Sequence, residues 1–321
     1  MKAIITTLVV CFVVKFDLCA QVDGSITVAK DGSGTFASVQ QAFEAVPVNN
    51  KREFTILVKK GVYKERLVLD STKAFVRLVG EDAANTILTF DNHSGRITPE
   101  GDTITTYSSA SFFILGNDFS AENITFENNA GFTAGQAVAV FAFGDRLKFK
   151  SCRFLGFQDV LLCSGVASRQ YFEKCYIEGT TDFIFGPSTA LFINCHIHSK
   201  KNSHVTAAST PKNVPYGFVF IDCKLTADEG LDKVSLGRPW RPYASVTYIR
   251  CDIGEHIFPE GWNNWRNPEN EKTARFTEYQ NTGPGANRDT RFKWIKQLSE
   301  SDAMSFTIKN IFGDWDPNRS L

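Results

Sequence analysis

Hydrophobic residues recur along this chain in short runs, and clusters of glycine, asparagine and aspartate separate these runs between residues 54 and about 257. The runs are rich in β-branched and aromatic residues, as in Thr55–Val58 and Val76–Val79, which is typical of β-strands. Similar runs lie at Phe112–Leu115 and Ala137–Phe141. Because no long helical pattern separates them, the chain is predicted to be all-β in this region.

One phrase repeats within the pattern: an aromatic residue, two further residues, a cysteine, one residue and then an apolar residue. The cysteines of its five copies are Cys152, Cys175, Cys195, Cys223 and Cys251. Repeats of 20 to 50 residues are typical of stacked coils, in which each turn buries its apolar face against its neighbours. The phrase therefore predicts a parallel β-helix of roughly eight to ten coils.

The first part of the chain predicts a helix, Phe36–Val46, which ends before Pro47. The terminal coil of a stacked structure needs a cover, so we expect this helix to cap the first coil. The overlapping segment Gly32–Ala37 matches the dinucleotide-binding pattern. That match is rejected, because a doubly wound sheet requires alternating helices that the rest of the chain lacks.

The repeat pattern fades after Trp262. A further helix is predicted over Asp289–Ser299, and the tail through Phe312 is expected to pack along the outside of the coils. No linker or low-complexity tract interrupts the chain, so we expect residues 21–321 to form a single β-helix domain.

The N-terminus has the features of a secretory signal peptide. Lys2 precedes the apolar run Ile4–Val14, and a short polar stretch ends at Ala20, the expected cleavage position. The run is too short to cross a membrane, and no later segment is apolar enough to do so. We therefore expect residues 1–20 to be removed from a secreted, extracellular protein with no membrane segment.

Six of the eight cysteines follow the predicted signal peptide and would reach an oxidising compartment. Most of them are expected to be small apolar core residues. Cys175 and Cys195 fall on adjacent coils, and we expect this pair to form a disulfide. Zinc binding is disfavoured, because the chain has no close Cys-x-x-Cys pair.

Charge argues against a nucleic-acid partner. The chain carries 35 lysines and arginines against 35 aspartates and glutamates, whereas a nucleic-acid binder shows a basic excess. The 28 phenylalanines against two methionines suit a flat, stacked interior. We expect a monomer.

Two aspartates occupy equivalent places in the repeat, because Asp159 and Asp182 each follow their own cysteine by seven residues. Strands of neighbouring coils lie about 4.8 Å apart, so the two carboxylates are expected to be close together. Two such carboxylates cannot both ionise cheaply, and one keeps its proton. A single aspartate before an aromatic run is most often a turn residue, but the shared register points to an acid–base pair.

Six spaced motifs resemble those of the pectin methylesterases, a carbohydrate esterase family. In chain order they are Val28–Gly34, Gly61–Glu65, Gly135–Ala139, Gly156–Leu161, Asp182–Gly186 and Leu236–Trp240. The resemblance runs from about Val28 to at least Trp265 and implies a right-handed parallel β-helix, in agreement with the repeat. The chain departs from the family at Val160, where a threonine is usual, but both polar residues before it are present.

The resemblance also implies the roles of five polar residues. Asp182 would be the nucleophile that attacks the ester carbonyl, and Asp159 the acid that protonates methanol and then the base that activates water. Arg238 would hold Asp182 ionised and oriented. Gln136 and Gln158 would donate hydrogen bonds to the oxyanion. Taken singly, the glutamines could form a structural ladder and the arginine a structural ion pair.

Several side chains are expected to contact the substrate, some from the resemblance and some from their position beside the aspartates. These residues are Thr106, Gln136, Phe157, Phe183, Arg238, Trp240 and Trp262. The phenylalanines and Thr106 could equally be structural, and Trp265 could be either a core residue or a platform for a sugar ring.

The implied activity is hydrolysis of the C6 methyl ester of galacturonate in homogalacturonan, the methyl-esterified part of pectin, with release of methanol and without a metal or other cofactor. No Gly-x-Ser-x-Gly elbow supplies a serine nucleophile. One alternative is a pectate lyase or polygalacturonase, although the acidic calcium cluster of a lyase is not evident. Another is a pectin-binding β-helix that has lost catalysis, although all five polar positions are present.

Overall fold

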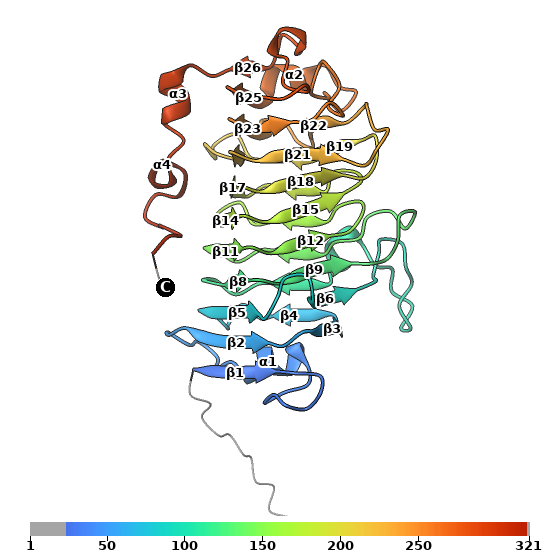
Figure 1. The fold of residues 1–321 in the computed structure, drawn as a ribbon, viewed down its shortest axis with the longest axis vertical. Helices are drawn as coiled ribbons and strands as arrows, with labels where there is room; N and C mark the ends of the chain where they lie inside the picture. The colour runs from blue at the N-terminus through green and yellow to red at the C-terminus, as the bar shows by residue number, and fades with distance from the viewer. Residues whose placement is uncertain (1–23, 320–321) are drawn as a thin grey trace, which may run out of the picture.

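The computed structural model describes residues 24–319, so the predicted signal peptide lies outside the described residues. The chain winds into an elongated stack of coils, and the named strands that pair do so in parallel (Figure 1). Three sheets of eleven, seven and eight strands run along the stack. Each coil contributes to successive sheets in turn, as the predicted parallel β-helix requires.

The eleven-stranded sheet runs the full length of the stack. Its strands are β1 (Ser25–Val28), β2 (Phe54–Val58), β5 (Val76–Gly80), β8 (Ser120–Glu122), β11 (Leu147–Lys150), β14 (Arg169–Glu173), β17 (Thr189–Ile193), β20 (Phe218–Ile221), β23 (Ser245–Ile249), β25 (Arg275–Tyr279) and β26 (Lys296–Gln297).

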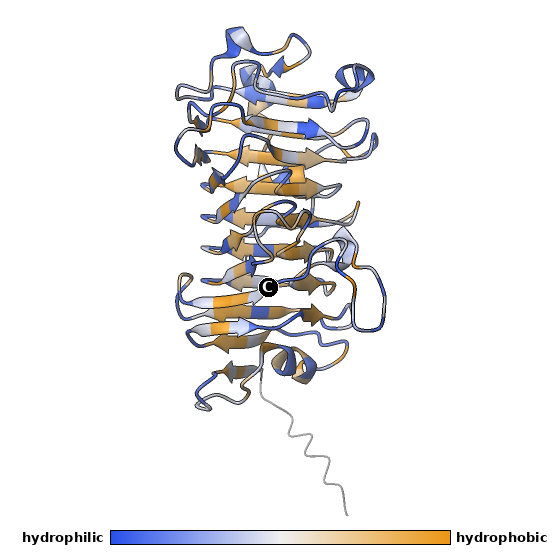
Figure 2. Cartoon of the chain, turned by 90° about the vertical axis from the view of Figure 1, so that its right-hand side faces the viewer, coloured by the Kyte–Doolittle hydropathy of each residue, from blue (hydrophilic) through white to orange (hydrophobic). Residues whose placement is uncertain are grey.

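The other two sheets are shorter. The eight-stranded sheet contains β3 (Gly61–Lys64), β6 (Thr86–Phe90), β9 (Thr125–Asn128), β12 (Arg153–Leu155), β15 (Tyr176–Gly179), β18 (His196–Ser199), β21 (Lys224–Ala227) and β24 (Asp252–Ile253). The seven-stranded sheet contains β4 (Leu67–Leu69), β7 (Phe112–Ile114), β10 (Val140–Ala142), β13 (Leu161–Cys163), β16 (Ile184–Gly186), β19 (His204–Ala208) and β22 (Ser235–Pro239). The strands appear in Figure 2 as largely apolar bands, with polar residues concentrated in the loops at their ends.

The aromatic residue of the repeated phrase forms a stack inside the coils. In chain order the five rings are Phe149, Phe172, Phe192, Phe220 and Tyr248, in register on five successive strands. Neighbouring ring centroids are 4.9, 4.6, 4.5 and 4.5 Å apart, and their planes lie within 10° of parallel. Such contacts between rings add to the free energy gained by burial, so the repeat codes directly for the core.

A second regularity lies at the corner between the eleven- and eight-stranded sheets. The residue before each repeated cysteine has a left-handed backbone with φ between 51° and 55°. These residues are Ser151, Lys174, Asn194, Asp222 and Arg250. Left-handed non-glycine residues are uncommon, and one at the same place on each coil turns the chain from one sheet to the next.

The predicted disulfide is not formed. All six cysteines of residues 24–319 are free and buried. Cys175 and Cys195 lie side by side on adjacent coils, but their side chains stack inward as thiols. The Cys195 thiol donates at 3.5 Å to the backbone oxygen of Phe172 on the preceding coil. The repeated cysteines are therefore small core residues, as expected for most of them.

The predicted cap is present as the helix α1 (Val39–Ala45), shorter than the range expected from the sequence. The carboxylate of Glu65 accepts hydrogen bonds from the Ser38 hydroxyl and from the backbone N–H groups of Val39 and Gln40. Phe43 on the buried face of the helix stacks on a core phenylalanine, with ring centroids 5.3 Å apart. Helix α1 thus covers the core at the start of the stack (Figure 1).

The helix predicted over Asp289–Ser299 is wrong. This segment contains a 3₁₀ turn, η2 (Arg288–Thr290), and then strand β26. The side chain of Arg291 is buried and donates from Nε to Glu278 Oε1 at 2.8 Å, and this ion pair holds the backbone against the last coil. A helical backbone would compete with both this contact and the pairing of β26 with β25.

The tail continues as α3 (Glu300–Met304) and α4 (Ile308–Phe312) along the outside of the eleven-stranded sheet (Figure 1). Phe312 and Trp315 pack there against an apolar patch that includes Tyr171. Two short elements complete the structure, η1 (Thr106–Ser108) and α2 (Glu269–Thr273). Among residues 24–319, no helix is long and apolar enough to cross a membrane.

Candidate active site

Asp159 and Asp182 lie on successive coils, just before strands β13 and β16. The register pairs Leu161 with Ile184, two residues beyond each aspartate, so the two carboxyl groups occupy equivalent places. Both residues have a left-handed backbone, with φ of 63° and 50°, and both are buried, with exposures of 8% and 6%. The expected juxtaposition is therefore present, and it is built by the corner geometry of the coils.

Arg238 on strand β22 makes a two-pronged ion pair with Asp182. Its Nε donates to Oδ1 at 2.9 Å, and its Nη2 donates to Oδ2 at 2.6 Å. Asp182 occupies one edge of the guanidinium, and the guanidinium carbon lies over the ring of Trp265, 3.7 Å from the centroid. A planar guanidinium held between a carboxylate and an aromatic ring has little freedom, so the Asp182 carboxylate has a fixed orientation.

The environments of the two aspartates separate their roles. Burial raises the pKa of Asp159 well above its usual value, and the nearby charge of Asp182 raises it further. Burial also raises the pKa of Asp182, but the hydrogen bonds and charge of Arg238 oppose that rise. Since Arg238 contacts Asp182 directly, the shared proton resides on Asp159 and the negative charge on Asp182.

His204 adds a polar but uncharged side chain beside the pair. Burial and the charge of Arg238 lower the pKa of His204 to about 4. Its Nδ1 lies 2.7 Å from the Ser235 hydroxyl oxygen. His204 is therefore neutral at ordinary pH and adds no second positive charge next to the Arg238–Asp182 pair.

The aspartates open into a cavity of about 220 Å³ on the outer face of the seven-stranded sheet. It is lined by Thr106, Tyr107, Gln136, Gln158, Asp159, Asp182, Phe185, Ala207, Arg238, Trp240 and Trp265. The two glutamines sit on adjacent coils, joined by a parallel bridge, and Gln158 directly precedes Asp159. The five polar residues predicted to carry the chemistry are thus brought together in one cavity.

Two expected substrate contacts are wrong. Trp262 is fully buried, and its indole Nε1 donates to Glu278 Oε1 at 2.8 Å. Its ring stacks on Phe276 with centroids 4.4 Å apart, so it belongs to the last turns of the core. Phe183 is also fully buried within the coils. The chain turns at Asp182, and the side chain that follows the aspartate points inward.

Of the remaining expected contacts, Thr106 and Trp240 line the cavity. Phe157 does not line it and instead lies beneath the amine of Lys200, 4.1 Å from the ring centroid. The contact predicted for Phe157 stays a prediction.

Sequence reasoning missed Tyr107, Phe185 and Ala207, and it left Trp265 undecided. The register offers a signal for two of them, because Phe185 and Ala207 pair with one another on the outer face of β16 and β19. Trp265 gives no such signal. It lies in a loop where its own φ is 60°, and only the folded chain shows that its ring meets Arg238.

A family model described as Pectinesterase matches residues 25–314. The chain belongs to the pectinesterase family. Among curated relatives, Pectinesterase 31 of Arabidopsis thaliana is 38% identical over 299 residues, which cover 92% of this chain and 93% of that protein. The family assignment makes the chain a carboxylic ester hydrolase, as expected from the motifs.

Solved pectinesterases share the architecture. A pectin methylesterase from carrot matches with a TM-score of 0.82 and 33% identity, covering 89% of this chain and 92% of that one. A pectin methylesterase solved in complex with a hexasaccharide matches with a TM-score of 0.81 and 28% identity, covering 92% of this chain and 98% of that one. Pectin methylesterase structures are right-handed parallel β-helices, so the predicted fold class is confirmed.

Proposed function

We propose that this pectinesterase hydrolyses the C6 methyl ester of galacturonate units in homogalacturonan by a mechanism that uses two aspartates. The observation that carries the proposal is the ion pair between Arg238 and Asp182 beside Asp159, whose pKa is raised. It supplies a fixed anionic nucleophile next to a proton donor in one cavity. The solved pectin methylesterase that holds a hexasaccharide supports a pectin substrate.

In the first half-reaction, a carboxylate oxygen of Asp182 attacks the ester carbonyl carbon and forms a tetrahedral oxyanion. The side-chain amides of Gln136 and Gln158, which line the cavity, are placed to donate hydrogen bonds to this oxyanion. As the carbon–methoxy bond breaks, Asp159 gives its proton to the departing oxygen, and methanol leaves. The galacturonyl group is then joined to Asp182 as an acid anhydride.

In the second half-reaction, Asp159 is ionised and accepts a proton from water, whose oxygen attacks the same carbonyl carbon. The bond to Asp182 breaks, and Asp182 leaves as a carboxylate held by Arg238. The product is a free galacturonate carboxyl group. Asp159 has taken its proton back from water and Asp182 is again a carboxylate, so both aspartates are in their starting protonation states, and the product carboxyl group then loses its own proton to solvent.

The cavity walls suit a sugar. Trp240 and Trp265 present aromatic rings, and Tyr107, which is 52% exposed, stands at the rim. Aromatic faces pack against the C–H faces of sugar rings, while the polar groups between them orient the ester. A buried apolar cluster on the same sheet, which includes Phe113 and Leu162, packs against Trp240 and Trp265 and supports these two walls of the cavity.

The proposed activity also bears on where the protein works. We infer that residues 1–20 direct secretion, that residues 21–321 act as a single catalytic domain, and that a monomer works outside the cell. The plant relatives are named pectinesterases, which supports an extracellular location.

The decisive experiment measures methanol release from highly methyl-esterified pectin. The wild type should release methanol without shortening the chains, whereas a lyase or polygalacturonase would shorten them. Asp182→Asn and Asp159→Asn should each lose at least about 10⁴-fold in rate, because each removes a group that makes or breaks a bond. Asp289→Asn, at an exposed aspartate outside the cavity, is the matched control and should keep the wild-type rate.

Two results would contradict the proposal. Methanol release by Asp182→Asn at the wild-type rate would show that Asp182 is not the nucleophile. Shortening of the pectin chains without methanol release would show that the protein is not an esterase. Pectin binding by the wild type with no turnover at all would favour the catalytically silent alternative.

A further inference from the structure

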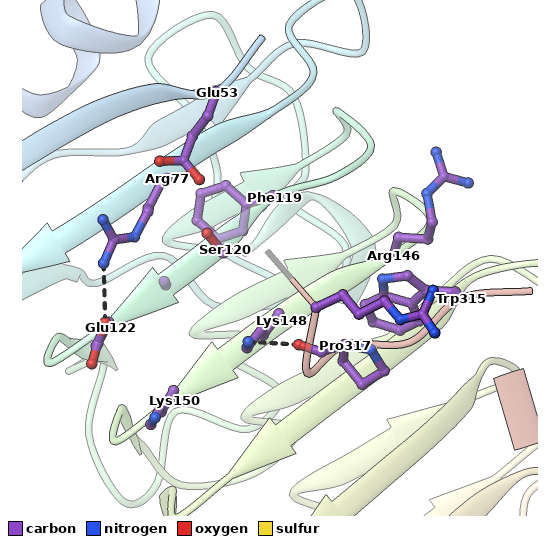
Figure 3. Close-up of a pocket in the computed structure, with 12 residues that line it drawn as sticks. Glu53, Arg77, Phe119, Ser120, Glu122, Arg146, Lys148, Lys150, Trp315 and Pro317 are labelled. Carbon is purple, nitrogen blue, oxygen red and sulfur yellow. Dashed lines mark hydrogen bonds and ion pairs between the residues drawn. The ribbon is translucent and has the colours of Figure 1, made fainter. Parts of the chain in front are cut away.

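A second cavity, of about 550 Å³, lies on a different face of the molecule from the aspartates (Figure 3). Its floor comes from strands β5, β8 and β11 of the eleven-stranded sheet, and its wall from the C-terminal tail at Trp315, Pro317 and Arg319. We call this cavity the tail pocket. The aspartates stand beside the seven-stranded sheet, so an occupant of the tail pocket would leave the catalytic cavity open.

The lining of the tail pocket is predominantly cationic. Its basic side chains are Arg77, Arg146, Lys148, Lys150 and Arg319, and its acidic side chains are Glu53 and Glu122. The chain as a whole carries equal numbers of basic and acidic residues, so this excess is a local feature. A concave surface lined by one sign of charge attracts ligands of the opposite sign.

Part of this charge is neutralised within the protein. Arg146 makes a two-pronged ion pair with Asp118 at 2.6 and 2.7 Å. Arg77 lies 3.4 Å from Glu122, and Figure 3 shows this pair at one side of the pocket. These two arginines shape the pocket and contribute less to the binding of an outside anion.

Lys150 and Arg319 are the cations that remain available. Lys150 sits in register between Glu122 and Glu173 on the neighbouring strands, yet its amine has no ion pair within 4.0 Å among residues 24–319. Arg319 is exposed at the rim, and among residues 24–319 its only ion pair is a 3.5 Å contact with Asp316. Both side chains can turn toward a ligand at small cost.

The pocket is preformed, because the tail is fastened to the sheet beside it. The amine of Lys148 donates to the backbone oxygen of Pro317 at 2.6 Å, as Figure 3 shows. Arg169 donates to the backbone oxygen of Phe312 at 2.7 Å. The ring of Phe312 packs edge-on against Tyr171 of strand β14, with ring centroids 6.5 Å apart. A wall held at three points needs little ordering when a ligand enters.

We propose that the tail pocket binds free carboxylates of an acidic polysaccharide, namely a de-esterified stretch of the chain that the catalytic cavity acts on. This proposal rests on the proposed function for the identity of the sugar. Lysine and arginine bind carboxylates by charge-assisted hydrogen bonds, while the side chains of Trp315 and Pro317 offer apolar contact to a sugar ring. Methyl-esterified units carry no charge and would not be held, so the pocket selects product over substrate.

Such a pocket would tether the enzyme to regions that it has already de-esterified. Because the two cavities lie on different sheets, one molecule could hold a de-esterified stretch of polysaccharide while it acts on an esterified one. A second attachment raises the effective concentration of the substrate at the catalytic cavity. The tether would matter for long polymers and would be absent for short esterified oligomers.

The test is a calorimetric titration of the full-length secreted protein with a fully de-esterified oligogalacturonate, compared with a neutral glucan of equal length. The double variant Lys150→Ala/Arg319→Ala should weaken the binding of the de-esterified oligomer at least about tenfold, as expected for the loss of two charge-assisted hydrogen bonds. Lys150→Arg should retain binding, because it keeps the charge. Lys224→Ala/Arg288→Ala, at exposed cations outside the pocket, is the matched control and should bind like the wild type.

Salt and activity measurements separate this proposal from the proposed function. Binding at the tail pocket should fall as salt rises, since exposed charges are screened. The double variant should release methanol from a short methyl-esterified oligomer at the wild-type rate. The proposal for the tail pocket would be wrong if the double variant and the wild type bound the de-esterified oligomer with equal affinity. It would also be wrong if the wild type bound the neutral glucan as tightly as the de-esterified oligomer. Failure of the wild type to release methanol would overturn the esterase and leave the binding result standing.

Discussion

Two residues of the same type acquire different chemistry from their immediate neighbours. Asp159 and Asp182 share a register position, a left-handed backbone and a buried setting. Only Asp182 accepts the two hydrogen bonds of Arg238, whereas burial and the nearby charge of Asp182 raise the pKa of Asp159. In the proposed mechanism, one guanidinium is therefore sufficient to decide which carboxylate holds the proton, and hence which would act as the acid and which as the nucleophile.

This asymmetry predicts a stability effect at Asp159. Its folded pKa is raised, so above the unfolded value the folded state binds more protons, and stability falls as pH rises toward the folded pKa. Asp159→Asn removes that loss and should melt at a higher temperature than the wild type at pH 7. The difference should vanish below about pH 3.9, where the carboxyl group is protonated in both states. Calorimetric melting at a series of pH values measures it.

The control for this effect is Asp289→Asn, whose aspartate is exposed. Its melting temperature should follow the wild type at every pH. If the wild type is more stable than Asp159→Asn at pH 7, the surroundings of Asp159 do not raise the pKa of its carboxyl group.

At the scale of the element, the repeated aromatic-x-x-Cys-x-apolar segment specifies three features together: a corner of the coil, a position in the core and a row of buried thiols. The aromatic residue enters the ring stack, the residue before the cysteine turns the chain, and the cysteine points inward. Rings such as Phe172 and Phe192 each contact the coil on either side. The stack therefore couples successive coils, and damage to one ring weakens two interfaces.

Replacement of a central ring tests this coupling. Phe192→Ala should lower the free energy of unfolding by about 3–5 kcal/mol, since it leaves a cavity between two stacked neighbours. Phe143→Ala provides the comparison, because that ring is 49% exposed, and its cost should be below about 1 kcal/mol. Urea denaturation followed by tryptophan fluorescence gives both values. Equal losses for the two variants would mean that the stack adds nothing beyond the burial of single side chains.

Much of this element-level structure could be predicted from the sequence, because the cysteine spacing repeats and because the aspartates keep a constant offset from it. The direction of individual side chains could not. Phe183 turns inward because Asp182 forms a left-handed corner, and a strict alternation along a strand does not anticipate that corner. Trp262 is buried because Glu278, a charged residue in a later strand, accepts its indole N–H.

Two further errors have the same origin in long-range contacts. An oxidising compartment and adjacent coils favoured a disulfide between Cys175 and Cys195, but both thiols stack within the core. The segment around Arg291 carries a helical pattern, and the buried ion pair of that arginine with Glu278 prevents the helix. The Cys195 thiol contacts the backbone of Phe172 on the preceding coil, and Arg291 contacts strand β25, so both outcomes depend on neighbouring turns of the stack.

At the scale of the whole molecule, different faces of the stack hold different sites. The seven-stranded sheet holds the catalytic cavity, and the eleven-stranded sheet carries the C-terminal tail and the tail pocket. The tail covers an apolar patch at Tyr171, Leu191 and Val219 that would otherwise face water. The stability contributed by the tail is thus separate in space from the chemistry.

This separation predicts that the tail can be weakened without slowing the reaction. Phe312→Ala/Trp315→Ala should lower the free energy of unfolding by several kcal/mol, because both aromatic side chains are buried against the sheet. The rate of methanol release from a short esterified oligomer at 25 °C should stay at the wild-type value. Met304→Ala, at a tail residue that is 73% exposed, is the control and should change neither quantity.

A fall in the rate of the folded double variant, at a temperature where it has not melted, would show that the tail communicates with the catalytic cavity. Melting curves recorded beside the rate measurements distinguish that result from simple unfolding.

The register between β13 and β16 has one consequence for how such an enzyme can change. Loops at corners away from the aspartates can lengthen freely, because they leave the pairing of Leu161 with Ile184 untouched. Loss of a single amino acid from within strand β13 or β16 would slip that pairing and rotate one acid group toward the interior. Natural variation and laboratory redesign therefore have wide latitude at the other corners of this fold and almost none at Asp159, at Asp182 and along the two short strands that follow them.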